Sequence, residues 1–357
     1  MTSSRSLRWA VPAAAVGLVA GVTVLPSALA SDNPDELSPR TAQQLLLDVA
    51  GQRPTALSGT VVQTSRLGLP ELPGTGGATG PLSLATGSHT LRVWADGPER
   101  LRVALLGTLD EYNVVRSGRD VWTYSSSQDE AVHRVLAEGR PQAPEPAVTG
   151  APSTPAEAAD IVLAAIDPTT EVMVDGAVTV AGRTARQLVL TPRDDQTLVG
   201  SVRLAIDAKT STPLRVQVFS SSDDVLPAVE VGFTDVTFEA PDPTVFDFIA
   251  PPGATVVKKQ PTARKDGADE APRDVPGARD VPGDGARPTV LGEGWSSVLV
   301  VEAAGVEALQ DQPLLDQLTR RVPEGRLLTS ALVSVLLTDD GRLLVGAVQP
   351  AVLQDAA

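Results

Sequence analysis

The chain has 357 residues, which is enough for two domains, and a hydrophobic content of 42% that is sufficient for packed cores. Its 44 acidic residues outnumber 29 basic ones, and the net charge of −15 would repel a nucleic-acid backbone over most of the surface. The absence of cysteine excludes disulfides, thiolate metal ligands, cysteine nucleophiles and a lipidated N-terminal cysteine.

The first 30 residues have the pattern of an export signal peptide. Arg5 and Arg8 precede an apolar run over residues 9–24, and Ala28-Leu29-Ala30 gives small residues before a cut ahead of Ser31. The alternative is an uncleaved membrane anchor, because the run is close to the length that spans a bilayer. With either outcome we expect an extracytoplasmic protein, secreted or held in the cell envelope.

Two helices are indicated by their start signals. Ser38-Pro39 places a capping residue and a first-turn proline before an apolar stripe that runs to Ala50. Thr154-Pro155-Ala156-Glu157 is a capping-box pattern and opens a second helix to about Ile166. Both helices are short, so they can cover only part of a sheet.

Alternating residues predict a long antiparallel meander between Gly87 and Leu136, where five short strands are joined by turns. A strand over Thr55–Leu67 precedes it, across a loop rich in glycine and proline. The other expected strands are Glu171–Val180, Ala185–Thr191, Ser201–Asp207, Leu214–Ser220 and Ala228–Glu239. In the last of these the apolar residues change parity, which predicts a bulge near Thr234-Asp235.

Residues 258–288 are predicted to be a disordered linker, because they lack an apolar period and repeat Arg-Asp-Val-Pro-Gly. The linker separates a domain over residues 31–257 from a small C-terminal domain over residues 289–357. In this small domain the pattern predicts a strand over Trp295–Glu302, a helix over Val306–Arg321, and strands over Leu328–Leu337 and Arg342–Val348. Asp339-Asp340-Gly341 marks the tight hairpin between the last two.

Patterns typical of enzymes are missing from the sequence. The two histidines, His89 and His133, lie in strand patterns without a second histidine at metal-ligand spacing, so we interpret them as hydrogen-bonded sheet residues. Paired carboxylates such as Asp223-Asp224 fall at turns, where solvated side chains are the rule. Calcium at one of these turns stays open, although no loop has EF-hand spacing. We predict no catalytic residue, no metal site and no cofactor.

Three segments carry a resemblance to a known superfamily. Arg100-Leu101-Arg102-Val103 precedes the segment Val114–Tyr124, which contains Gly-Arg-Asp-Val-Trp-Thr-Tyr, and the strands end at Pro243–Gly253, which closes with Phe-Ile-Ala-Pro-Pro-Gly. In this order and spacing, residues 38–257 resemble the LolA/LppX/RseB superfamily. The tail is similar, more weakly, to the C-terminal domain of RseB/MucB proteins, through residues 294–300 and a strand over residues 343–348 that ends at Pro350.

The resemblance implies an α+β fold: a half-open, strongly curved antiparallel β-barrel covered by helices, with a small C-terminal α+β domain. In this superfamily the concave apolar face holds acyl chains of lipids or lipoproteins and nothing is catalysed. Arg100, Arg102 and Arg203 are expected on the convex face, and Trp122 and Tyr124 are expected to pack against the helices. The candidate cavity residues are Leu91, Val93, Leu101, Val103, Leu105, Leu188, Leu190, Val202, Leu204, Val216 and Val218.

The first hypothesis is therefore a non-enzymatic carrier that binds lipid or lipoprotein acyl chains. The second is an RseB/MucB-type regulator that binds a membrane protein or an anti-sigma factor and senses envelope stress through the same cavity. A third reading makes the apolar residues an ordinary filled core and the chain a structural scaffold. Acyl burial contributes about 0.8 kcal/mol per CH₂, so a single chain is sufficient for tight binding without catalytic residues.

Overall fold

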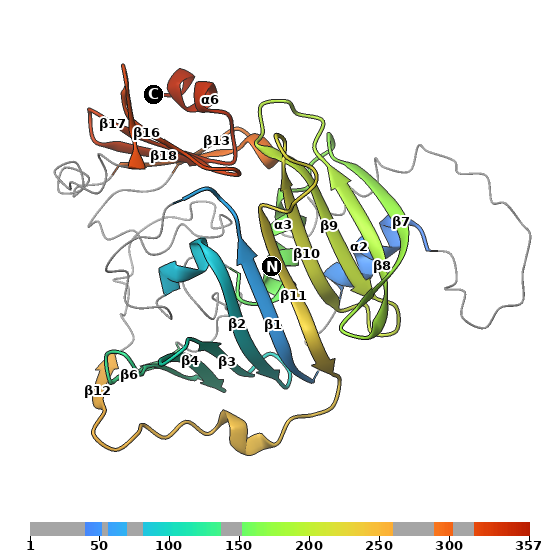
Figure 1. Cartoon of the computed structure of the whole chain (residues 1–357), viewed down its shortest axis with the longest axis vertical. Helices are drawn as coiled ribbons and strands as arrows, with labels where there is room; N and C mark the ends of the chain where they lie inside the picture. The colour runs from blue at the N-terminus through green and yellow to red at the C-terminus, as the bar shows by residue number, and fades with distance from the viewer. Residues whose placement is uncertain (1–39, 52–55, 70–80, 137–151, 260–288, 303–317) are drawn as a thin grey trace, which may run out of the picture. The chain divides into compact units, whose positions relative to one another are not determined.

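A computed structural model describes residues 40–51, 56–69, 81–136, 152–259, 289–302 and 318–357. The predicted signal peptide and residues 260–288 of the predicted linker lie outside these ranges. The chain forms two compact units: unit 1 is Met1–Gln52, Ala159–Ala228 and Pro282–Ala357, and unit 2 is Arg53–Ala158 and Val229–Val281. The structure is mostly antiparallel β with few helices (Figure 1). The curved antiparallel sheet of the predicted α+β fold is thus confirmed, whereas a half-barrel covered by helices and an α+β C-terminal domain stay predictions.

Unit 2 holds eight strands of a curved sheet. Their bounds are β1 Leu57–Ser65, β2 Gly87–Ala95, β3 Arg100–Leu106, β4 Glu111–Ser117, β5 Asp120–Ser125, β6 Glu130–Val135, β11 Val229–Thr237 and β12 Thr255–Lys259. They follow the order β12-β6-β5-β4-β3-β2-β1-β11. Every pair is antiparallel except β12 with β6, which run parallel. Since β12 is an edge strand, the sheet is not closed there.

The two faces of this sheet are covered by different segments. Gln63 donates a hydrogen bond to the Leu84 carbonyl in η3 (Pro81–Ala85), and Arg102 donates one to the Val245 carbonyl in η4 (Pro243–Phe246). The strand register places these two donors on opposite faces. We call the face under η3 the inner face and the face under η4 the outer face; the gold segment that contains η4 passes outside the bend of the sheet (Figure 1).

The strands predicted in the meander are confirmed, and so is the bulge in β11. Thr60 pairs with Asp235, whereas Val61 pairs with Phe233, so Thr234 is the extra residue. An extra residue shifts the side-chain alternation by one, which explains the change of parity in the sequence. Lys258 and Lys259, the first two residues of the predicted linker, pair with β6 as part of β12.

Unit 1 contains four more antiparallel strands in the order β10-β9-β8-β7. Their bounds are β7 Glu171–Val180, β8 Arg183–Thr191, β9 Val199–Asp207 and β10 Pro213–Ser220. Helix α2 (Ala42–Ala50) contacts β7 and buries Leu45, Leu46 and Val49. Helix α3 (Pro155–Ala165) buries Ala158, Ala159 and Val162.

The capping signals are borne out at one helix and corrected at the other. For α3, the Glu157 N–H donates to Thr154 Oγ1 over 3.1 Å, and the Glu157 carboxylate accepts the Ser153 N–H over 2.7 Å. Helix α2 begins at Ala42, with Thr41 as its cap, rather than at Ser38. The reason is a complete capping box, in which Thr41 and Gln44 satisfy each other's backbone N–H groups.

The C-terminal part of unit 1 is a six-stranded sheet in the order β13-β14-β18-β17-β16-β15. Its elements are β13 Thr289–Leu291, η5 Gly294–Ser296, β14 Val298–Glu302, β15 Arg320–Val322, β16 Gly325–Thr329, β17 Ser334–Thr338, β18 Arg342–Gly346 and α6 Pro350–Asp355. Val298, Leu327, Leu336, Leu344, Val348 and Leu353 form its core.

Three expectations for this sheet are corrected. The segment Leu328–Leu337 is two strands, because Ser330 closes a turn in which its Oγ accepts the Val333 N–H. Residues 320–322 form β15 instead of ending a helix, and residues 303–317 lie outside the described part. Trp295 belongs to η5, so the strand predicted over Trp295–Glu302 begins at Val298, and β13 (Thr289–Leu291) precedes it. The Asp339-Asp340-Gly341 hairpin is confirmed.

This C-terminal sheet is hydrogen-bonded to the β9 end of unit 1. The Leu198 N–H donates to the Ala347 carbonyl and the Gln349 N–H donates to the Gln196 carbonyl, each over 2.8 Å. These bonds flank an antiparallel bridge between Thr197 and Val348. The predicted domain boundaries at residues 257 and 289 remain a prediction. Among the helices of the described residues, none combines the length and hydrophobicity needed to cross a bilayer.

Candidate ligand-binding face

The predicted cavity residues fall on two faces, one in each unit. In unit 2, register places five of them on the inner face: Leu91, Val93, Leu101, Val103 and Leu105. In unit 1, cross-strand pairing places the other six on one face of β8, β9 and β10: Leu188, Leu190, Val202, Leu204, Val216 and Val218. Nine of the eleven are buried, and Leu101 and Val218 are half-buried. Their role in ligand binding remains a prediction.

One row of the inner face runs across six strands of unit 2. Its members are cross-strand partners and are here called the central row: Val93, Val103, Val114, Thr123, Val132 and Val257. With strands about 4.8 Å apart, the row measures about 24 Å along the sheet. It is almost wholly apolar, as a surface for an acyl chain has to be.

Exposure along the central row changes from one end to the other. Val93, Val103 and Val114 are 2%, 0% and 8% exposed, so the β2–β4 end is covered. Thr123, Val132 and Val257 are only half-buried. The apolar surface is therefore continuous from a closed end at β2–β4 to an accessible end at β12.

Two further rows border the central row. On one side the pairing aligns Leu101, Arg116, Val121, Arg134 and Lys259, and on the other it aligns Leu105, Tyr112, Ser125, Glu130 and Thr255. Burial raises the pKa of Tyr112, while a hydrogen bond with Thr123 and the charge of Arg134 act in the opposite direction. The positive charge of Arg134 thus acts to lower the pKa of the Tyr112 phenol, which lies on the inner face.

Sequence reasoning missed the three cations of this border, Arg116, Arg134 and Lys259. The alternation Glu130-x-Val132-x-Arg134 could have placed Arg134 on the same face as Val132. Lys259 could not have been placed, because it was assigned to the linker and its parallel partner strand was not foreseen.

The outer face carries an aromatic and arginine cluster. Trp122 and Tyr124 have Phe248 as their shared ring partner, at centroid distances of 5.2 and 6.1 Å. Their partner is thus the segment that follows η4 rather than a predicted helix. Arg102 lies over the ring of Trp94, 5.7 Å from its centroid, and its Nη1 donates to the Val245 carbonyl over 3.1 Å. Arg100 lies at 6.0 Å over Phe246.

The remaining polar candidates hold structural positions. His89 Nε2 is 2.7 Å from the Thr86 carbonyl, and His133 Nε2 is 2.7 Å from Asp120 Oδ1. Arg203, on the face opposite Leu204, lies over the Phe219 ring at 4.4 Å. In the described ranges, no three histidine, aspartate or glutamate side chains gather as metal ligands. Unit 2 thus offers an apolar track with a cationic border, which suits an amphiphilic ligand.

Residues 87–245 match the family model described as the MucB/RseB N-terminal domain. This match bears out the RseB part of the predicted resemblance over these residues. No curated protein matches the sequence.

Similar solved structures include the MucA/MucB complex of Pseudomonas aeruginosa, with 18% identity, 88% of this chain and 95% of that chain covered, and a TM-score of 0.41. An uncharacterized conserved protein from Thermus thermophilus has 17% identity, coverage of 61% and 99%, and a TM-score of 0.35. The lipoprotein LppX of Mycobacterium tuberculosis has 8% identity, coverage of 56% and 95%, and a TM-score of 0.28.

Proposed function

With the match of residues 87–245 to the MucB/RseB N-terminal domain as premise, we propose that this chain is an exported, non-catalytic envelope protein that binds an acyl chain. The acyl chain, from a lipid or a lipoprotein, lies along the central row of unit 2. The observation that carries this proposal is the fall in burial along that row, from Val103 at 0% exposure to half-buried Val132 and Val257.

The energetics of acyl burial support the proposal. Each CH₂ removed from water contributes about 0.8 kcal/mol, so ten methylenes contribute about 8 kcal/mol before the cost of association. A net value near half of that corresponds to a Kd of about 1 mM, and longer chains bind correspondingly tighter. Val93, Val103 and Val114 are buried, so an acyl chain that reaches β2–β4 has to displace the groups that cover them.

A matched pair of substitutions on β12 tests the proposal. Val257 belongs to the central row, whereas its neighbour Val256 is 46% exposed and points to the outer face. Val257→Gln should weaken the binding of a fluorescent fatty acid by about fivefold or more, since it places an amide in the apolar track. Val256→Gln is the control and should bind like the unmodified chain.

Native mass spectrometry of the purified full chain completes the test. We expect acyl-containing adducts on the unmodified chain and on the Val256→Gln variant, and a reduced amount on Val257→Gln. Equal binding by the two variants, at equal melting temperature, would show that the inner face does not hold the ligand.

A second function is a regulator of the RseB/MucB type, which binds an anti-sigma factor or another membrane protein. The observation that favours it is the family match itself, since the matching model is named for MucB and RseB. Capture from the membrane fraction with the full chain as bait tests it. A single stoichiometric membrane partner that is lost when acyl ligand is added would favour the regulator, and the absence of such a partner would favour the carrier.

A further inference from the structure

Three cations border the central row on the inner face of unit 2. Arg116 pairs with Val121, Val121 pairs with Arg134, and Arg134 pairs with Lys259, so these side chains leave the sheet on the same side. We call Arg116, Arg134 and Lys259 the cationic row. The net charge of the chain is −15, so a cluster of three basic side chains differs in sign from the chain as a whole.

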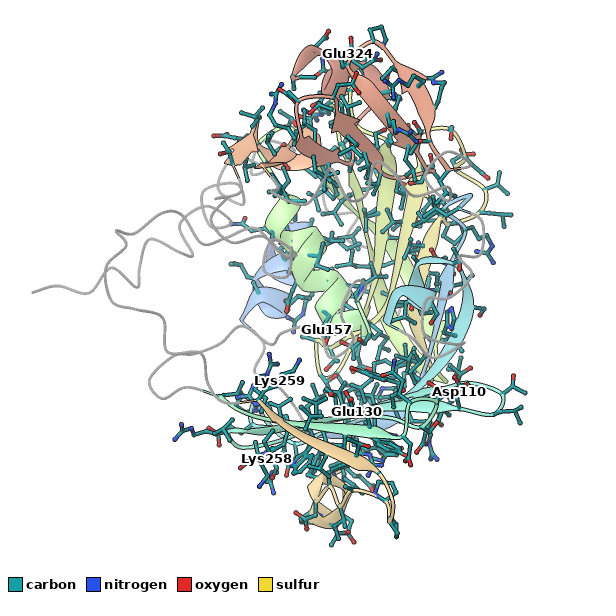
Figure 2. The ribbon with its side chains drawn as sticks, turned by 90° about the vertical axis from the view of Figure 1, so that its left-hand side faces the viewer. Asp110, Glu130, Glu157, Lys258, Lys259 and Glu324 are labelled. Atoms are coloured by element: carbon teal, nitrogen blue, oxygen red, sulfur yellow. The ribbon has the colours of Figure 1, made fainter. Side chains whose placement is uncertain are left out.

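The direction of these side chains is supported independently of register. Figure 2 shows Lys259 and Lys258 on opposite sides of β12, with Lys258 on the side of the gold segment that contains η4. Arg134 acts electrostatically on the phenol of Tyr112, which lies on the inner face. The cations therefore border the same surface that the central row forms.

The spacing of the three cations suits one anionic head group. Arg134 and Lys259 lie on neighbouring strands, about 5 Å apart at the backbone, and Arg116 lies two strands from Arg134, at about 10 Å. Arg116 is half-buried and its Nε donates to the Gly118 carbonyl over 3.1 Å, which limits its motion. Long side chains at these distances can converge on a single head group.

The acidic residue nearest in register lies across the track. Glu130 is on the inner face of β6, but Val132 separates it from Arg134 along the strand, a step of about 7 Å on either side. Across the inner face, along the strand direction, the cationic row comes first, the central row second, and the row with Tyr112 and Glu130 third. An amphiphile with an anionic head has one favoured orientation on such a surface.

We infer that the ligand is an anionic glycerophospholipid, with an acyl chain along the central row and the phosphate at the cationic row. This inference rests on the proposed function and adds the chemical class of the ligand. Guanidinium groups bind both carboxylates and phosphates in a bidentate fork. Phosphate is favoured here because a phosphodiester offers four oxygens to the three cations, whereas the carboxylate of a fatty acid offers two.

Neighbouring lysines provide the test. Lys259→Gln removes a cation from the inner face, and Lys258→Gln removes one from the outer face of the same strand. The probes are lysophosphatidylglycerol, a monoacylglycerol and a fatty acid of equal chain length. Lys259→Gln should weaken the binding of lysophosphatidylglycerol about fivefold, and the double variant Arg134→Gln/Lys259→Gln should weaken it further. The affinity for monoacylglycerol should stay unchanged in both variants. Lys258→Gln should change neither, and unchanged melting temperatures show that the variants fold.

Each other outcome counts against the inference. Equal effects of Lys259→Gln and Lys258→Gln would overturn it, and so would equal affinity of the unmodified chain for lysophosphatidylglycerol and monoacylglycerol, although acyl binding itself would then stand. A fatty acid that binds as tightly as lysophosphatidylglycerol would overturn the preference for phosphate. If the chain binds none of the three probes, the proposed function fails as well.

Discussion

The indole of Trp122 stacks on the imidazole of His133, with ring centroids 4.2 Å apart and planes inclined by 14°. The two residues are cross-strand partners in β5 and β6, and His133 also contacts Asp120 on β5 through Nε2. The ring of Phe248 lies 5.2 Å from the indole, with the two planes inclined by 34°. These ring contacts therefore join β5, β6 and the segment after η4.

Trp122→Ala should lower the free energy of unfolding by about 2–3 kcal/mol, because it removes a large aromatic side chain and its ring partners lose their contact. Urea denaturation followed by circular dichroism measures this change. Trp122→Phe is the control and should retain more than half of the stability, since a ring still faces His133 and Phe248. A loss below about 0.5 kcal/mol for the alanine variant would mean that the stack contributes little to the fold.

Asp207 should make the stability of unit 1 sensitive to acid. Burial alone would raise the pKa of this carboxyl, but hydrogen bonds from Arg183, Thr210 and Lys209 outweigh burial and hold the pKa below its usual value. The unfolded pKa is near 3.9, so the charged carboxylate stabilises the fold fully above that value. This contribution is lost as pH falls below about 4 through the lower folded pKa.

The measurement compares unfolding midpoints of the unmodified chain and of Asp207→Asn between pH 7 and pH 2. The variant should be less stable at pH 7, because Arg183 loses its bidentate partner, and the difference should shrink below about pH 4. Asp224→Asn, in the exposed loop after β10, is the control and should parallel the unmodified chain. A constant difference across the whole range would contradict the assignment.

The hydrogen bond between Trp295 and Thr170 should couple the C-terminal sheet to the rest of unit 1. Trp295 Nε1 donates to Thr170 Oγ1 over 2.8 Å, and both residues are buried. Trp295→Phe keeps an aromatic ring but removes the donor, so it should cost about 1 kcal/mol. A double-mutant cycle with Thr170→Val isolates the bond, and we expect a coupling energy of about 0.5–1.5 kcal/mol. Additive effects would show that the bond does not stabilise the contact.

The meander was predictable because alternation is a local signal. Leu91, Val93 and Val103 were assigned to one face from period 2 alone, and the structure places them on one face. The parity change in β11 predicted its bulge for the same reason. At the start of α2, sequence reasoning chose Ser38 as the cap, whereas the structure has a capping box between Thr41 and Gln44.

The cationic row was not predictable, because its members meet only through pairing. Arg116, Arg134 and Lys259 come from three strands, and the last joins through a parallel pairing with β6 that no short motif announces. Ser330 presents a different difficulty, because it is a local signal that was overlooked. This single turn residue divides the apolar run into the two strands β16 and β17. Long-range pairing and side-chain turn chemistry account for most of what the sequence did not reveal.

The pairing of β1 with β11 has a consequence for synthesis on the ribosome. Thr234 Oγ1 donates to the Thr60 carbonyl, and the two residues are 174 positions apart. At translation rates of about 5–20 residues per second, β1 leaves the ribosome about 9–35 seconds before its partner strand exists. Until then one edge of the nascent meander is unpaired and open to other chains. For a chain exported through the predicted signal peptide, delay of folding until after translocation would remove that exposure from the cytoplasm.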